Sequence, residues 1–219
     1  MLDIKEIAQK IDHTNLNNTA KSEDIIKLTN EAIKYKFASA VVNPTYVSLT
    51  HNLLKNTPVK TCTVIGFPLG HHTLETKITE TQQAIKDGAD EIDMVININT
   101  LKNNEFDKLF NEIEEIVLTS IGYTVKIIIE TGLLTKQEII IASQIAEEAG
   151  ADYIKTSTGF GGIPGAQLED IHLIKNNTNS IKIKASGGIR DSQKAIKMIN
   201  EGADRIGTSS GVKIIQNLL

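Results

Sequence analysis

The sequence predicts an α/β protein, a single (β/α)8 barrel that spans residues 1–219. Short apolar runs alternate with amphipathic segments about eight times without a break in composition, and this favours parallel strands joined by crossover helices. The chain length is close to that of a typical barrel. No Gly-x-Gly-x-x-Gly motif follows the first strand-like run, which disfavours a dinucleotide-binding sheet.

The predicted strands are short runs rich in β-branched and other apolar residues. Each is bounded by turn residues or by the start of a helical pattern. We expect them at Ile11–Thr14, Ala38–Asn43, Val59–Phe67, Glu91–Asn97, Val125–Thr131, Tyr153–Thr156, Ile181–Ser186 and Arg205–Thr208.

Between these runs, apolar residues recur with the three- to four-residue spacing of an amphipathic helix. This spacing predicts helices at Ser22–Lys36, Leu74–Lys86, Phe106–Thr119, Lys136–Ala149 and Ser192–Glu201.

A repeated helix-to-strand connection supports the barrel. Gly-Ala-Asp occurs at 88–90, 150–152 and 202–204, each time after a helix and directly before a strand. Glycine suits the left-handed backbone conformation that follows a last helical turn. The same helix-to-strand connection at three places favours a closed barrel of equivalent units, although an open doubly wound sheet would show similar connections.

Composition limits the classes of function. The formal net charge is -4 and no basic stripe is present, so neither nucleic acid nor an anionic membrane is an expected partner. No apolar run is long enough to cross a bilayer, and the N-terminus lacks the apolar core of a signal peptide. The only cysteine, Cys62, rules out an intrachain disulfide, and we expect a cytoplasmic protein.

Two lysines lie in apolar strands that end in glycine turns. Lys155 follows Tyr153 and Ile154, and Lys184 lies in Ile-Lys-Ile-Lys-Ala before Gly187 and Gly188. If the two strands are neighbours, burial and the ammonium of Lys184 would both lower the pKa of Lys155 and make it a nucleophile. This arrangement suggests Schiff-base chemistry on a carbonyl substrate. The alternative is that both lysines only reach out to water from strand ends.

In a barrel the chemistry sits at the carboxyl ends of the strands. Polar residues near these ends are Asp12, Asn43, Asp93, Asn97, Glu130, Lys155, Lys184 and Ser209. Asp93 lies within an apolar strand and shares a face with Val95, opposite Met94. A carboxylate that points into the barrel beside two lysines could relay protons. It could equally just neutralise a buried lysine. We expect Asp12 among the substrate-binding residues.

Late glycine turns predict a phosphate site. In barrels the last loops commonly bind phosphate through backbone N–H groups and hydroxyls. The turn residues here are Thr158, Gly159, Gly187, Gly188, Ser209 and Ser210. The five histidines show none of the spacings of a helix-borne zinc site, so we expect no metal and no other cofactor.

Seven stretches, in order over nearly the whole chain, carry a resemblance to a known family. They are 12–14, 42–46, 63–70, 88–97, 126–131, 155–160 and 184–190. They closely resemble the deoxyribose-phosphate aldolases, the DeoC family of class I aldolases. The resemblance implies a TIM-barrel fold and the reversible cleavage of 2-deoxy-D-ribose 5-phosphate to D-glyceraldehyde 3-phosphate and acetaldehyde.

The resemblance also implies roles for individual residues. Lys155 matches the Schiff-base lysine, Lys184 the second lysine and Asp93 the acid that shuttles protons. The phosphate-binding turns of the family match Gly159, Gly187, Gly188, Ser209 and Ser210. Many members carry a cysteine where this chain has Val41. Some carry a lysine where it has Phe160, and Arg190 or Lys213 could then balance the phosphate.

Two alternatives stay open. One is another imine-forming aldolase that acts on a different phosphorylated sugar. The other is a barrel that binds a phosphorylated metabolite without turnover, in which Lys155 and Lys184 only hold phosphate. Family habit suggests a homodimer.

Overall fold

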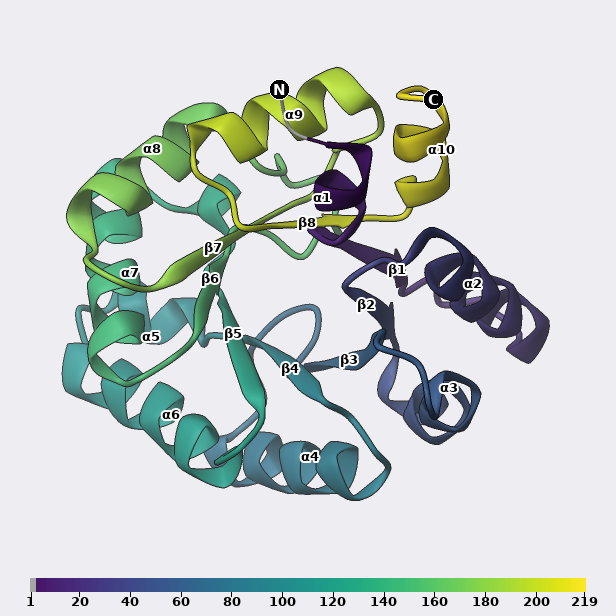
Figure 1. Cartoon of the computed structure of the whole chain (residues 1–219). Coiled ribbons are helices and arrows are strands. Elements are labelled where there is room, and N and C mark those ends of the chain that lie inside the picture. The colour runs from purple at the N-terminus through teal and green to yellow at the C-terminus, as the bar shows by residue number, and fades with distance from the viewer. Residues whose placement is uncertain (1–2) are drawn as a thin grey trace.

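A computed structural model of the protein describes residues 3–219 and shows a closed barrel of eight parallel strands (Figure 1). The strands are β1 (Ile11–Asn15), β2 (Ser39–Val42), β3 (Lys60–Ile65), β4 (Glu91–Val95), β5 (Thr124–Ile128), β6 (Tyr153–Lys155), β7 (Lys182–Ser186) and β8 (Arg205–Thr208). Each strand pairs with the next, and β1 pairs with β8. This closure confirms the barrel and excludes the open doubly wound sheet.

The helices form an outer ring around the strands (Figure 1). They are α1 (Ile4–Ala8), α2 (Ser22–Tyr35), α3 (Val47–Leu54), α4 (Leu74–Lys86), α5 (Ile98–Lys102), α6 (Phe106–Thr119), α7 (Lys136–Glu148), α8 (Leu168–Asn177), α9 (Ser192–Glu201) and α10 (Gly211–Gln216), with short 3-10 turns η1 (Pro44–Tyr46) and η2 (Thr131–Leu133). In the described residues, no helix is both long and apolar enough to cross a membrane.

Three predicted strands are too long by two or three residues at their carboxyl ends, each for a local reason. The third ends at Ile65 because Gly66 adopts a left-handed conformation with φ of 63°. The fourth ends at Val95, since the side chain of Asn97 accepts a hydrogen bond from the N–H of Asn99 and caps α5. The fifth ends at Ile128, shortly before Glu130 turns the chain at φ of 55°.

The Gly-Ala-Asp joints have a shared structural role. All three glycines have positive φ, as the repeat predicts. Each aspartate then accepts a hydrogen bond from a backbone N–H of the preceding strand: Asp90 from Thr61, Asp152 from Val125 and Asp204 from Ile183, at 2.8, 2.8 and 2.9 Å. The repeat therefore joins successive strands at the amino-terminal end of the barrel.

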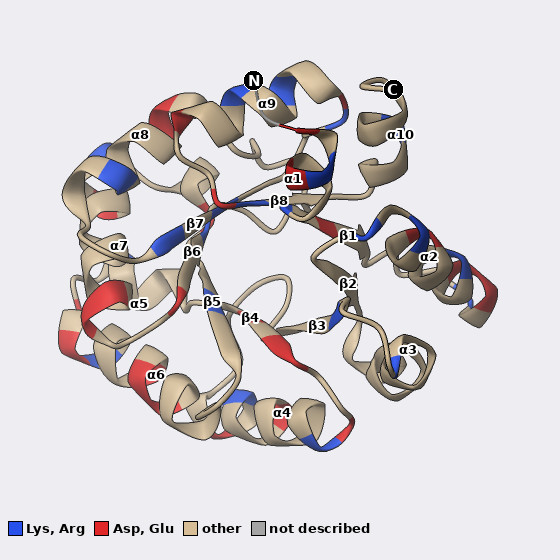
Figure 2. Ribbon diagram, viewed as in Figure 1, with Lys and Arg blue, Asp and Glu red and all other residues tan. Residues whose placement is uncertain are grey.

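The main apolar core lies between the strands and the helices. Ile92 and Met94 of β4 belong to it together with Ile113 and Ile116 of α6. Residues on the other face of β4, including Asp93, point into the barrel, where charged residues gather. Figure 2 shows blue and red segments on the strands as well as on the helices. The barrel interior therefore carries charge inside an apolar shell.

Candidate active site

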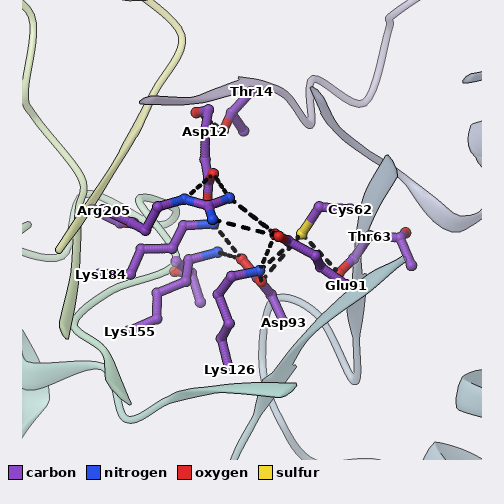
Figure 3. Close-up of polar contacts among 12 residues, drawn as sticks. Asp12, Thr14, Cys62, Thr63, Glu91, Asp93, Lys126, Lys155, Lys184 and Arg205 are labelled. Carbon is purple, nitrogen blue, oxygen red and sulfur yellow. Dashed lines mark hydrogen bonds and ion pairs between the residues drawn. The ribbon is translucent and has the colours of Figure 1, made fainter. Parts of the chain in front are cut away.

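Lys155 is the last residue of β6, and its side chain is 3% exposed. Strand register places it directly beside Lys184 of β7. Its Nζ donates a hydrogen bond of 2.8 Å to Oδ2 of Asp93 on β4 (Figure 3). The two lysines are therefore neighbours, as expected from the sequence.

Lys184 lies deeper in the barrel, between two carboxylates. Its Nζ is 2.7 Å from Oδ2 of Asp93 and 2.6 Å from Oδ2 of Asp12. Burial alone would lower the pKa of Lys184, but Asp12 and Asp93 outweigh it and raise that pKa above its ordinary value. Lys184 therefore stays protonated.

Lys155 behaves in the opposite way. Burial lowers its pKa, the carboxylate of Asp93 works against this, and the neighbouring ammonium of Lys184 lowers it again. The net direction is downward. The pKa of Lys155 is thus shifted toward the unprotonated, nucleophilic form of an amine, and that of Lys184 away from it.

Asp93 holds both lysines on a single oxygen. Its other oxygen, Oδ1, accepts a hydrogen bond of 2.9 Å from Nζ of Lys126. Burial would raise the pKa of Asp93, but Lys126, Lys155 and Lys184 together hold it well below the usual range. Asp93 is therefore a carboxylate that points into the barrel, as predicted for its face of β4.

Three charged residues next to this group were missed by sequence reasoning. Lys126 on β5 contacts Glu91 on β4 at 2.6 Å, and Glu91 in turn contacts Arg205 at 3.0 Å. Lys126 carries the same signal as Lys155, a lysine within an apolar strand, and could have been found. Arg205 opens β8 and reads in the sequence as an ordinary charged strand end.

The position of Asp12 differs from the prediction. It is the second residue of β1, so the prediction that it lies at the carboxyl end of its strand is wrong. The strand continues to Asn15, and it is Thr14 and Asn15 that reach the cavity at that end. Asp12 is fully buried and contacts Lys184, Arg205 and Ser39. Its contacts therefore link it to Lys184 and Arg205 and not to the predicted phosphate-site residues.

A cavity of about 640 Å³ opens at the carboxyl ends of the strands. Lys155 lines it, and so do five of the predicted phosphate-site residues: Thr158, Gly159, Gly187, Gly188 and Ser209. Ser210 comes directly after this lining, where its N–H donates to Oγ1 of Thr208 at 2.9 Å. The late turns and Lys155 thus face one space.

Gly187 needs to be glycine. Its φ is 87°, and a Cβ added there would lie 2.8 Å from Cα of Gly165. The absence of a side chain lets the backbone come close to a ligand in the cavity. Of the two cations that the sequence offers for balancing a phosphate, Arg190 lines the cavity, whereas Lys213 lies on α10 and is exposed.

Thr158 is already hydrogen-bonded within the protein. Its N–H lies 3.2 Å from both carboxylate oxygens of Glu130, and its hydroxyl also donates to Oε2. Burial raises the pKa of Glu130, and hydrogen bonds from Thr158 oppose that rise. Thr158 therefore shapes the turn after Lys155, and its donors face Glu130.

An apolar wall lies beside Lys155. The rings of Phe67 and Phe160 meet edge to face at 5.1 Å, and Nζ of Lys155 is 5.9 Å from the Phe67 ring. Both rings pack on a buried cluster that contains Val41 and Cys62. This wall limits water near the ammonium and favours its neutral form.

Comparisons with known proteins agree with this geometry. A family model described as DeoC/LacD family aldolase matches residues 6–217. A protein named deoxyribose-phosphate aldolase from Caldicellulosiruptor saccharolyticus is 53% identical, over 96% of this chain and 97% of its own. One of the same name from Dictyoglomus turgidum is 51% identical, over 97% of each chain.

Solved structures show the same fold. The tetrameric deoxyribose phosphate aldolase from Aeropyrum pernix superposes with a TM-score of 0.90 at 35% identity, covering 99% of this chain and 92% of that chain. A structure titled QR15, an aldolase, gives 0.93 at 40% identity, with 100% and 96% covered. The chain therefore belongs to the DeoC/LacD family of aldolases.

Proposed function

We propose that this chain reversibly cleaves 2-deoxy-D-ribose 5-phosphate to D-glyceraldehyde 3-phosphate and acetaldehyde, through an imine on Lys155. The observation that carries the proposal is that Lys155 faces the cavity and shares a carboxylate oxygen with the protonated Lys184. The family and the names of its relatives support the same substrate.

The first stage forms the imine. The lone pair of neutral Lys155 attacks the C1 aldehyde of the open-chain sugar and gives a carbinolamine. Its hydroxyl then takes a proton and leaves as water. Nζ of Lys155 and Nζ of Lys184 lie 2.8 and 2.7 Å from the same oxygen, Oδ2 of Asp93, so a proton can pass from Lys184 through Asp93 to the reacting centre.

The second stage breaks the bond between C2 and C3. Loss of the proton from the C3 hydroxyl releases D-glyceraldehyde 3-phosphate, and the electrons of the broken bond flow into the iminium to give an enamine. Protonation of the enamine at C2 and attack by water then free acetaldehyde and Lys155. The protein supplies the electron sink itself, so this route uses no cofactor.

The phosphate is proposed to bind at the glycine turns that line the cavity. The glycine turns at Gly159, Gly187 and Gly188 present backbone groups there, and Ser209 adds a hydroxyl. Arg190 supplies a cation on the same cavity wall. Phosphate held at these turns would leave the aldehyde end of the sugar to reach Lys155.

The test is peptide mass spectrometry after incubation with acetaldehyde and sodium borohydride. We expect a reduced ethyl adduct on Lys155, and no adduct in Lys155→Leu. Lys77→Leu is a matched control, because Lys77 is equally buried but pairs with Glu112 between α4 and α6. An active, folded protein without the adduct would refute the imine and favour a barrel that only binds phosphate.

A substrate profile separates this reaction from that of another imine-forming aldolase. In the synthetic direction the enzyme must accept acetaldehyde as the donor and D-glyceraldehyde 3-phosphate as the acceptor. If acetaldehyde is rejected while another donor is used with the same adduct on Lys155, the substrate assignment is wrong and the imine mechanism stands.

Two further proposals concern the setting of the enzyme. A homodimer is proposed from family habit, and a relative in the same family is described as tetrameric. Light scattering on the purified chain tests this. A cytoplasmic location is proposed from the single buried cysteine, and cell fractionation tests it.

A further inference from the structure

Six charged residues in the barrel, five of them buried and Arg205 partly exposed, form a closed ring in which acids and bases alternate (Figure 3). In order around the ring they are Asp93, Lys126, Glu91, Arg205, Asp12 and Lys184. Strand register creates the ring, because Asp93 pairs with Lys126 across β4 and β5, and Lys184 pairs with Arg205 across β7 and β8.

One side of the ring lies away from the nucleophile. Lys126 Nζ is 2.9 Å from Asp93 Oδ1 and 2.6 Å from Glu91 Oε2. Glu91 Oε2 is 3.0 Å from a guanidinium nitrogen of Arg205. Lys126 is 0% and Glu91 5% exposed, so both charges lie in the interior and not on the cavity surface.

The other side of the ring reaches the catalytic group. Arg205 donates from Nε to Asp12 Oδ1 at 2.8 Å, and Asp12 Oδ2 lies 2.6 Å from Lys184 Nζ. Lys184 closes the ring at Asp93 Oδ2, at 2.7 Å. Lys155 lies outside the ring and contacts the same Oδ2 at 2.8 Å.

The charges of the ring sum to zero. Three carboxylates (Asp93, Glu91 and Asp12) face three cations (Lys126, Arg205 and Lys184). Among the residues that the structure describes, Lys155 has an ion-pair partner only in Asp93, which the ring already balances. A protonated Lys155 is therefore a fourth cation against the three carboxylates of the ring.

We propose that Lys126, Glu91 and Arg205 are positioning residues, which keep Asp93 fully balanced so that Lys155, and not Lys184, is the amine released for reaction. This inference rests on the imine chemistry proposed above and extends it to residues that do not contact the substrate. The three act through Asp93 and Asp12. The net charge of the ring, rather than any single contact, then sets how readily Lys155 loses its proton.

Other charged groups face these lysines from the surrounding strands. Cys62 on β3 lies 3.5 Å from Lys126, and its pKa is raised by burial and by Asp93, so it stays a neutral thiol. Glu130, after β5, interacts with Lys155 and has a raised pKa because it is buried. Tyr153 on β6 lies under Lys126 and Arg205. Among the described residues, none of the three forms an ion pair with a member of the ring, and all three are unchanged in the variants below.

The proposal predicts shifts of opposite sign from two neighbouring residues. Lys126→Met makes the ring negative, which stabilises the ammonium of Lys155, and the acid limb of kcat/KM should move up by about one pH unit. Glu91→Gln makes the ring positive, and the limb should move down by about one unit. The double variant Lys126→Met with Glu91→Gln is neutral again, and its limb should return close to that of the wild type.

The measurement is the pH profile of retro-aldol kcat/KM, paired with the pH dependence of acetaldehyde trapping on Lys155 by cyanoborohydride. Lys77→Met is the matched control, because it also removes a buried lysine from a carboxylate but outside the ring. Its acid limb should stay in place. If Lys126→Met does not fold, Glu91→Gln and the double variant still test the sign.

A purely structural role would lower kcat/KM at every pH and leave the limb where it is. Unmoved limbs in folded variants, or shifts in the same direction for Lys126→Met and Glu91→Gln, would overturn the inference while wild-type trapping on Lys155 continued. Failure of trapping in the wild type would instead refute the proposed imine.

Discussion

Asp93→Asn tests the centre of the site. The substitution keeps the size of the side chain and removes the charge that balances Lys126, Lys155 and Lys184 at 2.9, 2.8 and 2.7 Å. Removing one partner of a buried ion pair destabilises a protein by about 3–5 kcal/mol. Each kcal/mol lowers Tm by about 2–4 °C in a chain of this size. We therefore expect Tm to fall by about 6–20 °C.

Activity should fall independently of stability. A positioned general acid or base contributes about 10²–10⁴-fold to the rate. At a temperature where the variant is folded, kcat should therefore fall by that factor, which corresponds to a rise of about 3–5 kcal/mol in the activation free energy. Loss of the negative charge also removes the group that raises the pKa of Lys155. The amine stays neutral, and slow adduct formation with acetaldehyde and cyanoborohydride should persist.

The assay couples acetaldehyde release to a dehydrogenase, beside thermal unfolding and trapping. Asp90→Asn is the control, because Asp90 directly precedes the same strand but accepts from the N–H of Thr61 and lies away from the lysines. It should keep near-wild-type kcat. If Asp93→Asn stays within tenfold of the wild type, Asp93 does not move protons in the reaction and the argument fails.

Three further predictions follow from other parts of the barrel. Lys184 and Arg205 lower the pKa of Asp12 despite its burial; its stabilising contribution is therefore full above about pH 3.9 and is lost as the pH falls through the folded pKa. In denaturant titrations from pH 7 to 2, Asp12→Asn should reduce the loss of unfolding free energy at low pH. An unchanged dependence on pH would contradict the pairing of Asp12 with Lys184 and Arg205. Gly187→Ala places a Cβ 2.8 Å from Gly165, so KM for 2-deoxyribose 5-phosphate should rise about tenfold or more, with KM for acetaldehyde in synthesis as the control. Val41→Cys puts a thiol in the cluster that also buries Cys62, whose pKa burial raises, so inactivation by crotonaldehyde should stay as slow as in the wild type; faster inactivation of the variant would contradict this.

The sequence predicts the fold and the pair of buried lysines because both depend on local patterns. Eight apolar runs separated by helical periodicity leave few arrangements, and the Gly-Ala-Asp joints repeat one geometry at three places. Lys155 and Lys184 are each found by their apolar surroundings. Adjacency of their strands, which the sequence only suggests, then brings them side by side.

The charge balance of the site depends on register and on depth, which no local pattern shows. Arg205 begins a strand and looks like a solvent-facing residue, yet it reaches Asp12 and Glu91 inside the barrel. Asp12 reads as a strand-end polar residue because the length of β1 cannot be judged from its apolar residues alone. Lys126 differs, since a lysine within an apolar strand is visible in the sequence, although no glycine turn follows it directly.

The ionic interior is explained better by chemistry than by stability. Barrel interiors are usually filled with branched apolar side chains, and apolar replacement of a whole buried ion network is often neutral or stabilising. Here the apolar core between the strands and helices already supplies the burial that stabilises the fold. The ring of charges is thus costly to break one member at a time but dispensable as a set. Such a network is what a site needs when one lysine must stay protonated while its neighbour, 2.8 Å from the same carboxylate oxygen, becomes neutral.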